Sequence, residues 1–80
     1  MRSAPILPLV DLPAGASAVV RSRAGGPEFV GRVSAMGIAP GATVDVLRNP
    51  RRGPLPVRVR DTRLALGRGE AAKVLVEPAS

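Results

Sequence analysis

Apolar and polar residues alternate in five short blocks of this chain, and a period of two predicts β-strands. The clearest block is 42–48, where the β-branched Val44 and Val46 alternate with polar neighbours. Strands this short close most readily into a small antiparallel barrel, which also removes exposed strand edges. We therefore expect a mainly β fold, first as such a barrel and second as an open sheet with a helix across it. The expected strands are residues 16–23, 42–48, 55–60, 63–66 and 73–77.

One segment has the helical period instead. Phe29, Val33 and Met36 lie at positions i, i+4 and i+7, so they share one face of a helix over residues 27–36. Pro27 suits the first position of that helix, because its missing N–H would have no partner there. The sequence thus predicts one short helix with a single apolar stripe.

The chain must end this helix, reverse and begin the next strand within five residues. Gly37 suits the position after the helix, and Ile38 can make the apolar contact that accompanies such a cap. Pro40 and Gly41 suit a tight turn, since proline presets φ and glycine accepts a positive φ. Gly37, Pro40 and Gly41 are therefore predicted to have structural roles.

The remaining segments give weaker signals. Residues 6–15 read as an entry segment with a single turn, and residues 67–72 can hold one helical turn. Residues 49–54 read as a basic loop. Pro56 removes a backbone donor from strand 55–60 and so favours an edge position in the sheet. We expect one domain over residues 1–80, with its core at 6–77 and a tail at 78–80.

Composition excludes several kinds of chemistry. The chain has no Cys and no His, so it offers no thiolate nucleophile, imidazole base or zinc-finger ligands. A single aromatic residue cannot build a base-stacking platform. No metal-site spacing occurs among the carboxylates, and we expect no catalytic residue, cofactor or small-molecule substrate. The carboxylates are Asp11, Glu28, Asp45, Asp61, Glu70 and Glu77.

The start of the chain loosely resembles a signal peptide. Pro5, Pro8 and Pro13 interrupt its apolar run, however, and Asp11 places a charge in the middle. No apolar run approaches the roughly 20 residues that span a bilayer. Because a secreted domain of this size usually needs disulfides, we expect a cytoplasmic protein.

The net charge is +6, and arginine supplies nearly all of the positive groups. Arg48, Arg51 and Arg52 surround the loop at 49–54. Arg58 and Arg60 are expected on one face of the following strand, a face that Arg21 and Arg23 would extend. Three uses remain open: contact with phosphates, contact with an acidic protein or membrane surface, and a solvated surface that keeps a small domain soluble.

One block is more specific than composition. Residues 32–48 contain Met36-Gly37-Ile38-x-Pro40-Gly41, followed by alternating valines. This block resembles the signature of the FeoA family, small cytosolic partners of the bacterial ferrous-iron transporter FeoB. It is also similar to the SH3-like domain at the C-terminus of iron-dependent repressors. Further matches cover about residues 6–77, at Leu9-x-x-Leu12-x-x-Gly15, Gly53-Pro54-Leu55, Val57-Arg58-Val59, Leu64-Ala65-Leu66, Glu70-Ala71 and Val74-Leu75-Val76.

Three residues depart from the family pattern. Asp61 stands where glycine is common, Gly67 where a basic residue often follows the strand, and Pro56 is unusual inside the hairpin. The position at Gly67 therefore supplies no positive charge of its own.

The resemblance implies an SH3-like barrel that acts as a non-enzymatic accessory of ferrous-iron transport. It would bind the cytoplasmic part of a FeoB-type transporter at the inner face of the membrane. The alternatives are a small basic nucleic-acid-binding barrel and an SH3-like regulatory domain related to iron-dependent repressors. We expect the partner contact to involve Met36, Ile38, Arg48, Arg51, Arg52, Arg58 and Arg60.

Overall fold

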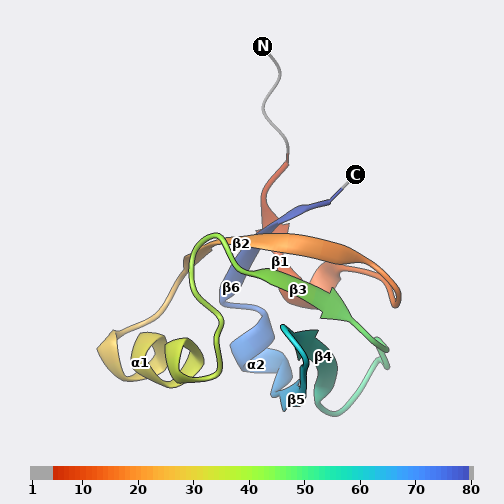
Figure 1. Ribbon diagram of the computed structural model, residues 1–80. Coiled ribbons are helices and arrows are strands. Elements are labelled where there is room, and N and C mark those ends of the chain that lie inside the picture. Colours follow the sequence, from red (N-terminus) through yellow and green to blue (C-terminus); the bar gives the residue numbers. More distant parts are fainter. Residues whose placement is uncertain (1–4, 80) are drawn as a thin grey trace.

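The computed structural model describes residues 5–79 (Figure 1). Six strands and two helices follow one another along the chain, with a turn of 3-10 helix near the start. The elements are β1 (Leu7–Pro8), the 3-10 helix η1 (Leu9–Asp11), β2 (Ser17–Arg23), α1 (Pro27–Ala35), β3 (Thr43–Val46), β4 (Leu55–Val59), β5 (Thr62–Leu66), α2 (Arg68–Ala71) and β6 (Val74–Pro78).

All six strands form one antiparallel sheet in the order β1-β6-β2-β3-β4-β5. The mainly β class and the short helix are confirmed, but the count of five strands was one too low. The missed strand is β1, in which Leu7 pairs with Val76 and Pro8 with Leu75. Two residues are too few to show alternation. At the other end of the chain β6 reaches Pro78, one residue into the predicted tail.

The strands do not remove every sheet edge, contrary to expectation. β1 and β5 are the two outermost strands of the sheet, and they are not hydrogen-bonded to each other. The helix α2, which follows β5, packs against η1, which follows β1. Figure 1 shows β4 and β5 at the end of the molecule away from the two termini.

The core is aliphatic and draws on nearly every element. No polar or charged residue is buried among residues 5–79, so apolar burial is the main stabilising term inside the fold. Phe29, the single aromatic residue, closes the core beneath α1. The fully buried larger side chains are Leu9, Val20, Val33, Ile38, Val44, Val46, Leu55, Val57, Leu66, Val74 and Val76.

The end of α1 has the predicted cap. Gly37 has a φ of 90°, and its N–H donates to the Ser34 carbonyl at 2.9 Å. The Ile38 N–H donates to the Val33 carbonyl at 2.9 Å. These two bonds form a Schellman motif, and the buried Ile38 and Val33 side chains supply its apolar contact.

Pro56 does not lie at a sheet edge, so that expectation was wrong. β4 has β3 on one side and β5 on the other. The Pro56 carbonyl accepts a hydrogen bond from the Leu47 N–H at 3.0 Å, beyond Val46, where β3 ends. The nitrogen of Pro56 faces that same side, because the two polar groups of one residue in a strand point the same way. The missing donor therefore costs the ladder little.

Candidate interaction surface

Residues 5–79 enclose no pocket and bring together no group of three metal-ligating side chains. Within the same residues no helix is both long and apolar enough to cross a bilayer. Every charged side chain in this range reaches the surface at least in part. These side chains therefore lie on an open surface, where some of them bond to other groups of the fold and others do not.

The two apolar residues predicted to contact a partner lie in different environments. Met36 caps α1 and is half-buried against the core. Ile38 is fully buried, so its side chain offers no surface to a partner. We correct the expectation for Ile38: the same sequence motif that suggested a contact residue uses it as the apolar anchor of the helix cap.

Five arginines are engaged within the fold. Arg21 pairs with Glu77 at 2.9 Å, and Arg23 donates to the hydroxyl of Ser34 in α1. A β-bulge between Val20 and Ser22 interrupts the alternation of β2 between these two arginines. Arg21 shares the sheet face of Ser17, which pairs with Asp45 beside Arg58, so it continues that face as expected. Arg23 lies beyond the bulge and turns toward α1. The other engaged residues are Arg32, Arg58 and Arg68.

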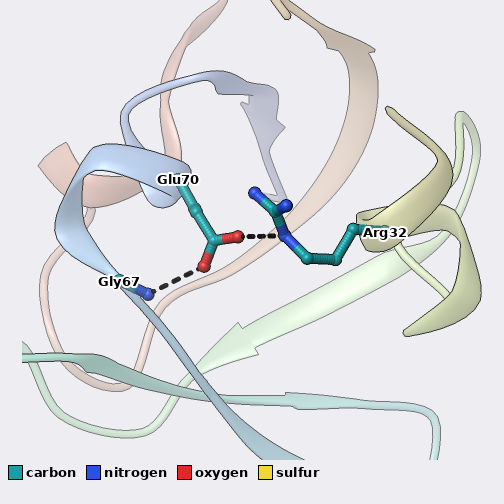
Figure 2. A network of polar contacts seen from close by, with 3 residues as sticks. All are labelled: Arg32, Gly67 and Glu70. Atoms are coloured by element: carbon teal, nitrogen blue, oxygen red, sulfur yellow. Dashed lines mark hydrogen bonds and ion pairs between the residues drawn. The ribbon is translucent and has the colours of Figure 1, made fainter. Parts of the chain in front are cut away.

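Glu70 links the two helices (Figure 2). One carboxylate oxygen accepts from the Arg32 Nε at 2.7 Å, and the other accepts from the Gly67 N–H at 3.2 Å. The hydrogen bond from Arg32, and after it the bond from Gly67, holds the pKa of Glu70 below its usual range. Glu70 thus caps the start of α2 and joins it to α1.

This arrangement predicts that the free energy of unfolding falls slightly at acidic pH. Because the folded pKa of Glu70 is lowered, its stabilising contribution is present above the unfolded pKa and is lost as the pH falls through the folded value. Both side chains are partly exposed, so we expect Glu70→Gln to cost less than about 1 kcal/mol near neutral pH.

Urea unfolding at several pH values measures this difference between the parent and Glu70→Gln. The gap should narrow as the pH falls below the ordinary pKa of a glutamate, and it should close once the pH is also below the lowered pKa of the folded Glu70, where the parent carboxylate is neutral. A gap that stays constant down to pH 2 would assign the loss to packing and not to charge.

Asn49 and Arg68 anchor the basic loop, and neither role was predicted from the sequence. The Asn49 amide donates to the carbonyls of Val10 and Leu12, and its oxygen accepts from Arg68 at 3.0 Å. Arg68 also donates to the Pro50 carbonyl. These bonds join η1, the loop and α2. An asparagine before a proline hints at a turn, but its partners lie too far along the chain to be read from the sequence.

The loop is confirmed, and its arginines point into solvent. Arg48, Arg51 and Arg52 are exposed and form no ion pair within residues 5–79. Their backbone is held by the Asn49 and Arg68 contacts at the base of the loop. The result is a group of three free cations on an anchored support.

Arg58 and Arg60 do not share a strand face, contrary to expectation. β4 ends at Val59, and Arg60 occupies the turn to β5 with a φ of 59°. Arg58 lies on the outer face of β4 and pairs with Asp45 of β3 at 3.5 Å. Arg60 and the loop at 49–54 lie at opposite ends of β4, a separation of roughly 15 Å for a strand of this length.

Comparison with known proteins gives a consistent result. The model of the FeoA domain family matches residues 7–78. A Methanocaldococcus jannaschii protein named for Fe(2+) transport, transport protein A, is 33% identical over 72 residues, which cover 90% of this chain and 87% of that protein.

Two solved structures have the same fold and comparable identity. A crystal structure of the iron uptake regulatory protein FeoA superposes with a TM-score of 0.90 at 32% identity, covering 94% of this chain and 100% of that one. FeoA of Stenotrophomonas maltophilia, described as an SH3 domain protein and crystallised with zinc, has a TM-score of 0.76 at 32% identity, covering 86% and 87%. The predicted SH3-like fold is confirmed.

The similarity to repressors is a similarity of fold alone. A manganese-dependent transcriptional repressor superposes with a TM-score of 0.87 at 18% identity, and the match covers 99% of this chain but 45% of the repressor. The family match over residues 7–78 and the identity to transport protein A are far more specific. The chain therefore belongs to the FeoA family.

Proposed function

We propose that this chain is a non-enzymatic accessory protein of ferrous-iron transport that binds the cytoplasmic part of a FeoB-type transporter. The observation that carries the proposal is the family match across residues 7–78. The transport role named for the Methanocaldococcus jannaschii relative supports it. In this proposal the protein resides in the cytoplasm and reaches the inner membrane face through its partner.

The surface of the molecule supports a role in binding. Among residues 5–79 the cations with neither an ion pair nor a side-chain hydrogen bond within the fold are Arg48, Arg51, Arg52, Arg60, Arg63 and Lys73. Lys73 lies 5.4 Å from the centroid of the Phe29 ring, so it too has a partner within the fold. The free arginines give the molecule an outward positive field that favours acidic partners and raises association rates at low salt.

The direct experiment measures binding of the full chain to the purified cytoplasmic domain of the transporter, together with ferrous-iron uptake in a strain that lacks this protein. We expect binding in the micromolar range or tighter and reduced uptake in the strain. Normal uptake together with no binding at high protein concentration would refute the proposal. Affinity for duplex DNA that falls steeply with salt would favour the nucleic-acid alternative instead.

The loop arginines provide a sharper prediction. Replacing both Arg51 and Arg52 by glutamate should weaken transporter binding by about tenfold or more, because it reverses two exposed charges on an anchored loop. The matched control replaces both residues by lysine, which keeps the charge and should retain most of the affinity. Unchanged affinity of the glutamate variant would remove the loop from the interface.

A further inference from the structure

The outermost strand β5 has an unused hydrogen-bonding edge. Its five residues pair with β4 on one side only. The other outermost strand, β1, is two residues long and contains Pro8, so it offers little to a new strand. β5 contains no proline and lies at the end of the molecule away from the termini (Figure 1).

The register shows which backbone groups of β5 are free. Pro56 directs its carbonyl toward Leu47, so its pair with Ala65 is not hydrogen-bonded. In an antiparallel ladder the bonded and unbonded pairs alternate, so the Arg58–Arg63 pair is also unbonded. The N–H and C=O groups of Arg63 and Ala65 therefore point away from β4. None of the hydrogen bonds within residues 5–79 uses them, and both residues are exposed.

The side chains beside this edge are positively charged. Arg58 and Arg63 lie directly opposite each other on the outer face, and in an unbonded pair their side chains are close. Like charges in this position destabilise a sheet. Asp45 lies on the β3 side of Arg58, whereas no carboxylate within residues 5–79 pairs with Arg63. A carboxylate placed beyond β5 would relieve this repulsion.

We propose that β5 binds an acidic, extended segment of a partner protein, which adds to the sheet as a seventh strand. The segment hydrogen-bonds to the backbone of Arg63 and Ala65, and its carboxylates face the Arg63 and Arg58 guanidinium groups. Strand addition obtains affinity from main-chain bonds and specificity from alternate side chains. The proposal deepens the proposed function by naming the partner's chemistry, and it rests on that function for the partner's identity.

Substitutions at Ala65 test the free backbone edge of β5 without changing its pairing with β4. Ala65→Pro removes the outward N–H but leaves the ladder to β4 intact, because that N–H does not bond to β4. Ala65→Val at the same position keeps the N–H and serves as the matched control. Arg63→Glu reverses the charge without a change in the backbone. Circular dichroism and thermal unfolding establish that each variant is folded.

The experiment titrates the isotope-labelled full chain with a peptide of about six residues in which glutamate and valine alternate, and with its lysine–valine counterpart. We expect the amides of Arg63 and Ala65 to shift and to gain protection from hydrogen exchange with the acidic peptide alone. Ala65→Pro should weaken binding about fivefold to tenfold. Arg63→Glu should weaken it at least tenfold, and Ala65→Val should bind like the parent.

Several outcomes would overturn the proposal. Equal binding of the two peptides would do so, as would amide shifts confined to residues 49–54. Self-association of the chain through β5 would also contradict it. So would binding of anionic vesicles without binding of the acidic peptide. The transporter domain then separates the two proposals. If it binds the parent, Ala65→Pro and Arg63→Glu equally well, the edge proposal fails and the proposed function stands. If the acidic peptide binds β5 but the transporter domain does not bind, the proposed function fails.

Discussion

Replacing Ile38 by alanine is expected to lower the free energy of unfolding by about 3–4 kcal/mol, close to the whole stability of a domain this small. Ile38 is fully buried and is the apolar anchor of the cap that ends α1. Its truncation would open a cavity among aliphatic neighbours that have no polar group to admit water. The chain has no Trp or Tyr, so far-UV circular dichroism during urea unfolding is the suitable measurement.

Two further variants give this prediction its controls. Ile38→Val removes one methylene group and should cost about 0.5–1.5 kcal/mol. Met36→Ala truncates a half-buried side chain two residues away and should cost about 1 kcal/mol. If Ile38→Ala remained as stable as Met36→Ala and lost only its affinity for a partner, Ile38 would be a surface contact and its place in the core would be wrong.

The helix, its cap and the main strands could be predicted because their signals are local. Pro27 and Gly37 bracket α1, and the spacing of Phe29 and Val33 identifies its inner face. The alternation of Val44 and Val46 marks β3 in the same way. In each case residues within one or two turns supply both the signal and the partner, so no knowledge of the tertiary fold is required.

The errors arise where distant segments decide the outcome. Pro56 looked suited to an edge, yet β4 has a neighbour on both sides. The proline is tolerated there because its nitrogen faces the chain beyond Val46, where β3 ends. The alternation of β2 did not foretell the bulge that separates Arg21 from Arg23. A bulge depends on the register with the neighbouring strand, and that register is fixed only when the sheet forms.

The sequence gives the total charge of the surface but not its distribution. It shows a net charge of +6, whereas the fold decides which arginines meet a carboxylate. Glu77 and Glu70 lie 56 and 38 residues from the arginines they bind. What remains for a partner is the loop group, Arg60 in its turn and Arg63 on the edge strand. The candidate surface therefore consists of the arginines that remain once those bonded to other groups of the fold are set aside.

A large backbone effect is expected at Gly37, and Gly41 provides its matched comparison. The two glycines have nearly identical φ values, 90° and 91°. A Cβ added at Gly37 would lie 3.3 Å from the Val59 Cγ1, whereas one added at Gly41 would meet nothing within 4 Å. Both substitutions carry the cost of a positive φ, which is about 1–2 kcal/mol for an L-residue.

We therefore expect Gly41→Ala to cost about 1–2 kcal/mol and Gly37→Ala about 2–3 kcal/mol, measured by the same urea unfolding. A double-mutant cycle identifies the source of the difference. Val59→Ala removes the opposing methyl group, so the extra loss at Gly37 should disappear in that background, while the loss from the positive φ remains. Equal losses at the two glycines in the parent would mean that Val59 moves aside freely. The tight approach of the α1 cap to β4 would then have no energetic role, and the Met-Gly-Ile motif would be explained by its backbone conformation alone.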